Sequence, residues 1–345
     1  MIKPWGVTCI QPIIRVVTDK KSRDQRIREN LSRNMEIIDM LCVDARYKSK
    51  VVVFPEFFLT SVPESRKHEE YMMRSIYVPG KETEIMSAKA REHGLYIVGN
   101  VFELDDQWPD RCFNTSFIID PKGNVALKYR KVNDTQIYSP TNTNTGDVYS
   151  RFVEMYGEDA LFPVLDTPLG RLSCLTCYDI NFPEVARILS LKGAEVIFMP
   201  TGDGYGWAKR HAIMRQARAM ENMVYIVSVT HGKFMYGARP EHQQAGNSGI
   251  TDFAGNITDI ADGPGELTIS GIIDIQSLRE RRAMLNHFNY LVGFRGTLYA
   301  KYYEKAPTWP LDNWLEKPMR SNQEALELGQ KILEGLYEKG IYVRP

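Results

Sequence analysis

The sequence has no long apolar run, and neither sign of charge is in excess. No window approaches the roughly 18 consecutive apolar residues that a membrane-spanning helix needs, so we expect no membrane insertion. Lysine plus arginine and aspartate plus glutamate number 43 each, which gives no indication of nucleic acid or an anionic membrane as the main ligand. The N-terminal segment MIKPWGVTCIQPII lacks the apolar centre and the cleavage site of a signal peptide.

Cysteine is scarce, with five in 345 residues. An odd number of cysteines in a long chain argues against a disulfide scaffold, so we expect reduced thiols and a cytoplasmic location. Cys174 and Cys177 form a CxxC pair, but an odd separation in a strand directs the two sulfur atoms to opposite faces. No second CxxC and no histidine pair completes four zinc ligands, so we predict no metal site there.

What the sequence does have is a regular alternation of strand and helix patterns. The order strand, helix, strand, helix, strand, β-hairpin occurs twice. The segments of the first half are 7–14, 23–47, 51–54, 82–93, 95–102 and the hairpin 114–119 with 125–129. Those of the second half are 172–176, 183–191, 195–199, 205–222, 224–229 and the hairpin 249–253 with 257–260, followed by a last strand at 266–275. This order predicts an α/β fold in which two mixed sheets pack face to face with helices outside.

The pattern changes from about residue 276. Arginine, tyrosine and proline become frequent, and an amphipathic helix at 322–339 closes the chain. This segment has too few apolar residues to form a core of its own. We therefore predict one domain at 1–275 and a C-terminal extension at 276–345, which packs on that domain or on a second subunit.

Two charged residues follow directly after predicted strands. Glu56 lies just past the apolar strand 51–54, where desolvation raises the pKa of a carboxyl group and suits it to proton transfer; the alternative is a capping glutamate. Lys131 ends the segment KYRK, and strand alternation places it opposite Arg130 and Lys128. One of these cations can therefore point inward, although a solvated cationic face is the alternative.

Cys177 lies at a turn from a strand into a helix. The partial positive charge at a helix N-terminus favours the thiolate over the thiol. Backbone N–H groups at such a turn are also placed to bind an oxyanion. The alternative is a buried cysteine with a structural role.

Taken together, FPEFF around Glu56, KYRK ending at Lys131 and CYDINFPEVAR from Cys177 resemble the Glu–Lys–Cys signature of the nitrilase, or carbon–nitrogen hydrolase, superfamily. The segments FNTSFIID, RQARAMENMVYIV and NSGITDFAGNI support the resemblance, which covers about residues 5–275. The order of elements is also similar to that family's α-β-β-α sandwich. The fold that the resemblance implies therefore agrees with the fold inferred from the alternation of strands and helices.

The resemblance implies hydrolysis of an amide through a thioester. Cys177 would attack the carbonyl carbon, and Glu56 would take the thiol proton, pass it to the departing amine and then activate water. Lys131 and the N–H of Tyr178 would stabilise the oxyanion. No metal or organic cofactor is required, the partner is a small-molecule amide, and a homo-oligomer, at least a dimer, is expected.

Two departures from the family pattern bear on the substrate. Many members carry a second glutamate shortly after the lysine, whereas this loop has Asp134 and Asp147 and no glutamate before Glu154, so we leave that position unassigned. Ile180 and Asn181 stand where many members have arginine, which binds a substrate carboxylate. Their presence argues against an N-carbamoyl amino acid and favours a small or uncharged carboxamide.

We expect the wall of the substrate pocket to come from several aromatic and polar residues. These are Tyr178, Asn181, Tyr205, Trp207 and His231, together with the loop 139–150. His211 lies within the helix 205–222 between arginines, and we interpret it as a surface or interface histidine. Core packing is the alternative for the aromatic residues.

Other functions remain open at this stage. On the same fold, the substrate can be a nitrile or an N-carbamoyl compound. From other classes, the chain can be a non-catalytic binding protein or take part in amide transfer to a partner synthetase. No GxxxxGK[ST] motif for ATP is present in the chain itself, so such a partner would be separate.

Overall fold

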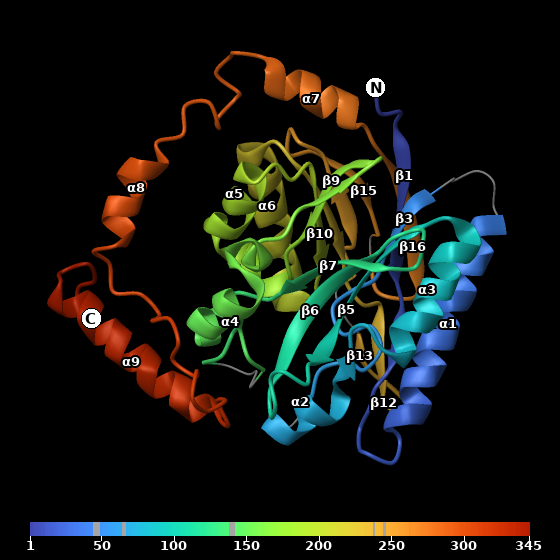
Figure 1. Ribbon diagram of the computed structural model, residues 1–345, viewed down its shortest axis with the longest axis horizontal. Helices are drawn as coiled ribbons and strands as arrows, with labels where there is room; N and C mark the ends of the chain where they lie inside the picture. Colours follow the sequence, from blue (N-terminus) through green and yellow to red (C-terminus); the bar gives the residue numbers. More distant parts are fainter. Residues whose placement is uncertain (44–48, 64–66, 138–141, 237–238, 244–245, 262) are drawn as a thin grey trace.

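The chain forms a sandwich of two β-sheets with helices on both outer sides, as seen in the computed structural model (Figure 1). This arrangement confirms the predicted α/β fold class. The structure describes residues 1–43, 49–63, 67–137, 142–236, 239–243, 246–261 and 263–345.

The first sheet has the order β16-β1-β3-β5-β6-β7, and β4 pairs with β5. Its inner strands β1, β3 and β5 are parallel, and β6 and β7 form an antiparallel hairpin at one edge. The strands are β1 (Trp5–Gln11), β3 (Ser49–Val53), β4 (Ile76–Tyr77), β5 (Tyr96–Leu104), β6 (Cys112–Ile119), β7 (Val125–Arg130) and β16 (Leu267–Ile273).

The second sheet has the order β15-β14-β11-β10-β9-β8 and repeats this plan. Strands β9, β10 and β11 are parallel, and the hairpin of β14 and β15 is antiparallel. The strands are β8 (Leu165–Thr167), β9 (Gly170–Cys174), β10 (Val196–Pro200), β11 (Tyr225–Val229), β14 (Gly249–Thr251) and β15 (Ile257–Ile260). The two halves of the chain therefore have the duplicated order that the sequence predicts.

Strand alternation divides the apolar residues between two layers of core. Val51 and Val53 of β3 belong to the cluster between the sheets, whereas Val52 packs with the residues beneath α1 (Arg23–Val43) and α3 (Lys81–His93). Parallel strands buried on both faces need such continuous apolar runs. On the second sheet, α5 (Pro183–Leu191) and α6 (Tyr205–Asn222) form the outer layer.

Several boundaries differ from the sequence prediction. The strand predicted at 7–14 is broken at Pro12, which lacks an N–H group for the ladder, and the chain continues as β2 (Ile13–Arg15) in a small sheet with β12 (Lys233–Tyr236) and β13 (Arg239–Gln243). The final strand ends at Ile273 because the Asp274 side chain caps a helix by accepting a hydrogen bond from the Ser277 N–H. Residues 44–47, the predicted end of the first helix, lie outside the described residues.

Four short helices were not predicted. They are α2 (His68–Arg74), α4 (Tyr149–Tyr156), α7 (Ile275–Ala283) and α8 (Gly296–Tyr303). The last helix, α9 (Asn322–Glu338), agrees with the predicted one. Within the described ranges, no helix combines the length and apolar character needed to cross a membrane.

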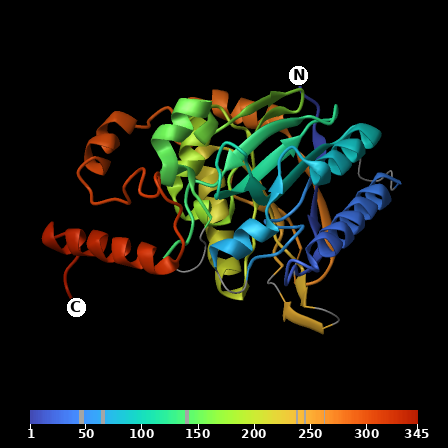
Figure 2. The same ribbon diagram turned by 60° about the horizontal axis from the view of Figure 1, so that its bottom comes forward.

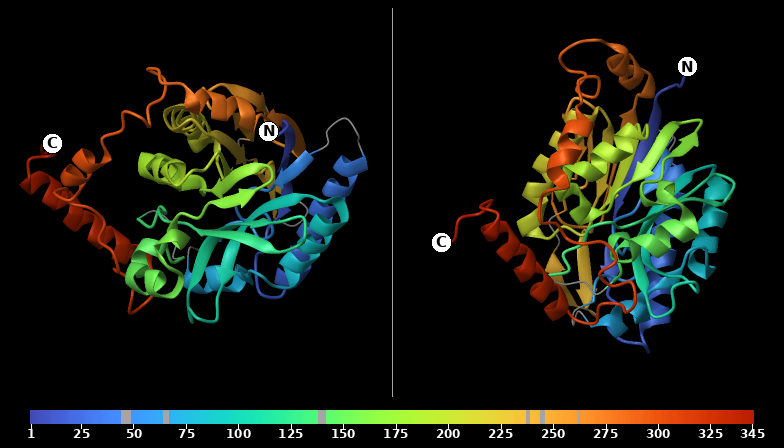
Figure 3. Two further views of the ribbon diagram at one scale, coloured as in Figure 1. Left: turned by 45° about the horizontal axis from the view of Figure 1, so that its top comes forward. Right: turned by 60° about the vertical axis from the view of Figure 1, so that its left-hand side comes forward.

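The segment after α7 runs away from the sandwich and contacts it again at several places, among them a hydrogen bond from the Tyr303 hydroxyl to Glu184 on α5. Figures 1 and 3 show α8 and α9 beyond α5 and α6, and Figure 2 shows α9 extending outward from the sandwich. The segment returns beside α4, where the N–H of Asp312 donates to the Gly146 carbonyl (2.9 Å) and the N–H of Trp314 donates to the Asp147 carbonyl (3.1 Å). Arg111 Nη2 fixes the same turn by donating to the Trp314 carbonyl at 2.6 Å.

Asp147, at this return point, is a buried carboxyl group with a perturbed pKa. Burial raises its pKa from 3.8 to about 7, although hydrogen bonds from the Asn144 N–H and Gln136 Nε2 oppose the shift. Because the pKa in the folded state is above that in the unfolded state, the folded protein holds the extra proton between these two values. Asp147 therefore contributes its full stabilisation of the folded state below about pH 4, and this contribution is lost as the pH rises through 7.

We predict that Asp147→Asn, which cannot ionise, raises the free energy of unfolding at pH 8 by on the order of 1–3 kcal/mol. The gain should shrink towards pH 5, because wild-type Asp147 is then protonated. Urea denaturation at both pH values measures it, with the exposed Asp166→Asn as the control. An equal effect of Asp147→Asn at pH 5 and pH 8 would contradict the assignment.

Candidate active site

Loops from the carboxyl ends of strands in both sheets enclose a cavity of about 310 Å³. Glu56 follows β3, Lys131 follows β7, Cys177 follows β9 and Asp203 follows β10, and all four line this cavity. Such loops gather side chains from distant parts of the sequence at one edge of a sheet. The structure therefore brings together the three residues that the sequence singles out.

Glu56 is almost completely buried, with 2% of its surface exposed. Its Oε1 accepts hydrogen bonds from Lys131 Nζ (3.0 Å) and Asn114 Nδ2 (2.7 Å). Burial raises the pKa of Glu56 above its usual value, and the charge of Lys131 only partly opposes this effect. A Cβ at Gly202 would lie 3.2 Å from Oε2, so glycine allows the backbone to approach this oxygen closely.

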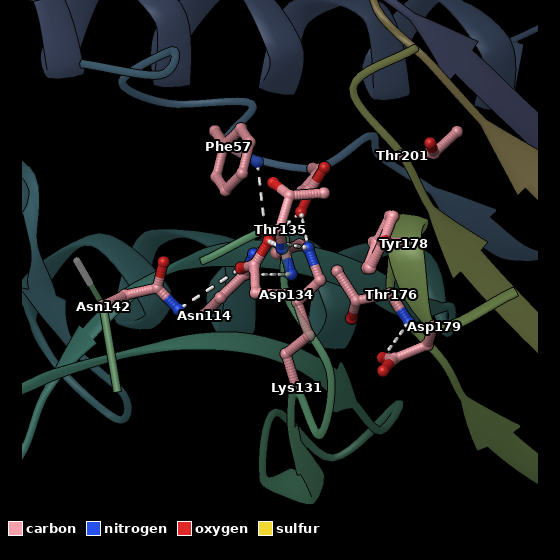
Figure 4. A network of polar contacts seen from close by, with 12 residues as sticks. Phe57, Asn114, Lys131, Asp134, Thr135, Asn142, Thr176, Tyr178, Asp179 and Thr201 are labelled. Atoms are coloured by element: carbon pink, nitrogen blue, oxygen red, sulfur yellow. Dashed lines mark hydrogen bonds and ion pairs between the residues drawn. The ribbon is translucent and has the colours of Figure 1, made fainter. Parts of the chain in front are cut away.

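Lys131 points into the cavity, while its neighbours in sequence point away. Lys128 and Arg130 both pair with Glu103, at 2.7 and 2.9 Å, on the other face of the strand. The Lys131 ammonium lies 3.0 Å from Glu56 Oε1 and 3.3 Å from Asp134 Oδ1. Figure 4 shows Lys131 and Asp134 side by side. Burial disfavours its charge, but the carboxylates of Asp134 and Glu56 outweigh burial and raise the pKa of Lys131, so the ammonium is charged.

Asp134 is the acidic group nearest to Lys131 in the loop where the sequence left the family's second glutamate unassigned. Its Oδ2 accepts a hydrogen bond from Asn142 Nδ2 (3.4 Å), and both residues line the cavity. Asp134 follows the lysine by three positions. That spacing is the signal that sequence reasoning passed over.

Cys177 occupies a strained turn. Its φ angle of 46° lies in the left-handed region, which costs a residue other than glycine roughly 1–2 kcal/mol. Cys177 is the first residue of a short 3-10 helix (Cys177–Asn181), which leads into α5. The turn is held by the Thr176 N–H, which donates to Asp179 Oδ2 at 3.1 Å (Figure 4), and by the hydrogen bond between the Ser116 and Thr176 hydroxyls.

Asp179 connects the turn of the cysteine to the loop of the lysine. Besides the Thr176 N–H, it accepts hydrogen bonds from the Tyr129 hydroxyl (2.7 Å) and from the Asn133 N–H (2.9 Å). Tyr129 and Asn133 lie on either side of Lys131 in the sequence, so one buried carboxyl group sets the position of two candidate residues. Sequence reasoning missed it, although the spacing T-x-x-D before a helix is a capping signal.

The predicted preference of Cys177 for the thiolate is wrong for the resting protein. The side chain keeps some solvent contact through the cavity, but the packed walls remove it from bulk water and raise the pKa of the thiol well above 9.0. The Glu56 carboxylate adds to this rise, and Lys131 only partly offsets it. The thiol is therefore protonated at neutral pH and needs a base before it can act as a nucleophile.

Of the residues predicted to form the pocket wall, Tyr178 and Trp207 do so, whereas Asn181 and His231 do not. Tyr178 and Trp207 line the cavity with ring centroids 6.2 Å apart. Asn181 lies outside the lining and donates to the Tyr178 carbonyl at 2.8 Å, and His231 is fully buried against Phe234.

Some of the other residues predicted to form the wall lie outside the part of the chain that the structure describes. Tyr205 begins α6, and its side chain lies outside the described part of the chain, as do residues 139–141 of the loop 139–150. An apolar side of the cavity was not predicted and consists of Phe57, Val62, Pro63, Tyr71 and Phe102.

His211 is not the surface histidine that the sequence suggested. It is buried, lines the cavity, and its Nδ1 lies 2.7 Å from Asp203 Oδ1. Ala208, Arg215 and Ala219 are buried on the same face of α6, at helical spacing from His211. This periodicity was available in the sequence, but the flanking arginines obscured it.

Two groups of side chains among the described residues offer three potential metal ligands each. One is the partly exposed cluster of Asp39, Glu92 and His93, and the other consists of Cys177, Asp203 and His211, whose ligand atoms lie within 4.8 Å of one another. In the second group, His211 Nδ1 and Asp203 Oδ1 are 2.7 Å apart and hydrogen bonded to each other. Ligands around a zinc ion lie about 2 Å from it and spread tetrahedrally, so this contact fits a proton-sharing pair better than a metal site.

This arrangement is suited to acyl transfer, because a nucleophile, a base and a cation converge on one cavity. Comparison with known proteins gives a consistent result. The model of the carbon-nitrogen hydrolase family matches residues 21–283. An omega-amidase from Xenopus tropicalis is 28% identical over 259 residues, which are 74% of this chain and 87% of that protein.

Two further similarities concern a formamidase and an amidase. The formamidase of Bacillus cereus (strain Q1) is 31% identical over 236 residues, which are 66% of this chain and 64% of that protein. The structure of a variant amidase from Nesterenkonia sp. AN1, with the acetamide moiety of fluoroacetamide added covalently at its active-site cysteine, matches with a TM-score of 0.60 and 19% identity. The match covers 86% of this chain and 97% of that one. Since the family model spans well over half of the sequence, the chain belongs to the carbon–nitrogen hydrolase family and is a hydrolase that acts on C–N bonds.

Proposed function

We propose that the chain hydrolyses a small, uncharged carboxamide to a carboxylic acid and ammonia through a thioester on Cys177. The observation that carries this proposal is that Glu56, Lys131 and Cys177 line one cavity, with Lys131 Nζ 3.0 Å from Glu56 Oε1. No cofactor is needed for this chemistry.

In the acylation step, Glu56 takes the proton of the Cys177 thiol, and the sulfur attacks the amide carbon. The raised pKa of Glu56 brings it closer to neutral pH, where a carboxyl group both accepts and returns a proton efficiently. The charged Lys131 and the N–H of Tyr178 stabilise the oxyanion. The proton held by Glu56 then passes to the nitrogen, the C–N bond breaks and ammonia leaves. Water subsequently attacks the thioester and releases the acid.

The cavity wall and the relatives support the proposed substrate class. Phe57, Tyr71 and Phe102 form an apolar side, and Tyr178 and Trp207 close another, so the acyl part of the substrate is apolar and of modest size. The relatives include an omega-amidase and formamidases, which supports an amide as the substrate. A panel of amides, nitriles and N-carbamoyl compounds with ammonia detection tests this choice; consumption of nitriles alone would favour a nitrilase.

We predict that Cys177→Ala and Cys177→Ser lose turnover by at least about 10³-fold while the chain still folds, since no other thiol faces Lys131 and Glu56 among the described residues. Cys174→Ala is the matched control: Cys174 lies in the core three residues away, so its loss should reduce stability by on the order of 1 kcal/mol and leave turnover intact. Ammonia release and thermal unfolding measure the two effects. Full activity of either Cys177 variant would refute the mechanism.

We predict that kcat/KM falls as the pH drops through the pKa of Glu56, at a pH above the usual value of 4.5 for a glutamate, because the ionised form is the base. Glu56→Gln should lower kcat by about 10²- to 10⁴-fold at every pH. Glu184 follows the same Phe-Pro dipeptide in a second FPE segment but bonds the Tyr303 hydroxyl instead, so Glu184→Gln is the matched control. Normal kinetics of Glu56→Gln would remove this residue from the reaction.

We also propose that the chain works in a reducing compartment, the cytoplasm, as a homo-oligomer whose contact includes α5, α6 and the C-terminal extension 276–345. All five cysteines are free thiols, which suits such a compartment. Leu191 on α5 and Ile213 on α6 expose 53% and 62% of their surfaces, and Leu285 in the extension exposes 87%. Exposed apolar side chains on neighbouring elements are typical of a surface that another protein covers.

We predict that the chain is at least a dimer at micromolar concentration and that Ile213→Asp shifts it towards the monomer, because the contact would bury the new charge. Ile85→Asp is the matched control, since Ile85 is a half-exposed isoleucine on α3, an outer helix of the other sheet. Light scattering after size-exclusion chromatography measures the mass. A monomeric wild-type chain would exclude the proposed oligomer.

A further inference from the structure

A second set of proton-handling groups faces the cavity from the other sheet. Asp203 follows β10, and His211 lies on α6; both are buried and both line the cavity. Asp203 Oδ1 accepts a hydrogen bond from the Thr201 hydroxyl (2.5 Å) and lies 2.7 Å from His211 Nδ1. A carboxylate that holds one ring nitrogen fixes the orientation and the tautomer of the imidazole, as in enzymes that use histidine as a base.

This pair is close to the nucleophile. One ring nitrogen of His211, one carboxylate oxygen of Asp203 and Cys177 Sγ all lie within 4.8 Å of one another. Asp203 holds Nδ1, so Nε2, which lies 3.5 Å from Asn181 Nδ2, is the nitrogen left to contact a water molecule while the acyl group is on the sulfur. Trp207 packs against the His211 ring, with centroids 5.8 Å apart, and limits its movement.

Glu56 has a different set of partners, which occupy one of its two oxygens. Its Oε1 is already bonded to Lys131 and Asn114, so Oε2 is the oxygen that remains for proton transfer. In acylation this oxygen takes the thiol proton and returns it to the departing nitrogen. The loop after Lys131 provides no second glutamate before Glu154, and its Asp134 is engaged by Lys131 and Asn142, whereas Asp203 and His211 face the cavity from the other sheet.

We propose that the Asp203–His211 pair is a second proton-transfer unit, which activates the water that hydrolyses the Cys177 thioester. This inference rests on the proposed function and assigns to the pair the step for which the family resemblance implied Glu56. Glu56 then serves acylation, and the pair serves deacylation.

The step balances without any further reagent. The water oxygen attacks the acyl carbon and forms a C–O bond, and one water proton passes to the pair. The C–S bond then breaks with its electron pair on Sγ, and the pair returns the proton to the sulfur. The products are the free carboxylic acid and the Cys177 thiol.

The test separates acylation from deacylation with 4-nitrophenyl butyrate as the probe. Nitrophenolate leaves without protonation, so acylation of Cys177 by this ester does not depend on a proton donor. Nitrophenolate release in the first turnover therefore measures acylation, and the later linear rate measures deacylation. The variants are His211→Gln, Asp203→Asn and, as the matched control, His93→Gln, since His93 is bonded to Asp39 at 2.8 Å outside the cavity.

We expect His211→Gln and Asp203→Asn to release about one equivalent of nitrophenolate rapidly and then to turn over roughly 100-fold more slowly than wild type. Intact mass should show the butyryl group on Cys177, and hydroxylamine, a stronger nucleophile than water, should restore the linear rate. His93→Gln should behave as wild type.

Either of two results would overturn the inference: an unchanged linear rate in both variants, or a slower rate with no acyl group on Cys177. Asp203→Asn gives a second, independent reading if His211→Gln does not fold. Cys177→Ala tests the proposed function separately. If this variant releases nitrophenolate as fast as wild type, the thioester mechanism itself fails, whatever the His211 variants do.

Discussion

The buried ion pair between Lys131 and Glu56 is the interaction on which the site depends. Removing either partner from such a pair leaves an uncompensated charge in the interior, which typically costs about 3–5 kcal/mol. Here the pair is also bonded to Asn114 and to Asp134, so the two charged side chains have fixed positions. Its position links β3 to β7 across one sheet, and the cysteine is delivered to it from the other sheet. The sandwich therefore serves to hold oppositely charged groups and a neutral thiol around one small space.

The electrostatics of this cavity explain why the resting Cys177 thiol keeps its proton and when the sulfur reacts. A thiolate beside Glu56 and Asp203 would be repelled and poorly solvated, so the resting sulfur carries its proton. When an amide enters, the developing negative charge moves from the sulfur to the carbonyl oxygen, where Lys131 is available. The cavity thus favours the charge distribution of the tetrahedral intermediate over that of a free thiolate.

Much of the fold was predictable from the sequence, because apolar alternation and helical periodicity are local. The helices at 183–191 and 205–222 have the predicted bounds, and each candidate residue follows a predicted strand. The environment of these residues was not predictable in the same way. The thiol's pKa depends on Glu56, which is 121 positions away, and the arrangement of the extension depends on contacts such as that of Trp314 with Asp147. The burial of His211 was within reach of periodicity but was obscured by the flanking arginines, whereas its pairing with Asp203, which precedes the helix, was not predictable from periodicity.

The central claim is that Cys177 carries the acyl group during turnover. Mass spectrometry of the protein quenched while it hydrolyses a small amide such as butyramide tests this claim most directly. The account predicts one acyl group per chain, located on the peptide that contains Cys177 and absent after mild treatment with hydroxylamine. Release of ammonia at a steady rate with the Cys177 peptide unmodified throughout, or an acyl group on any other residue, would contradict it.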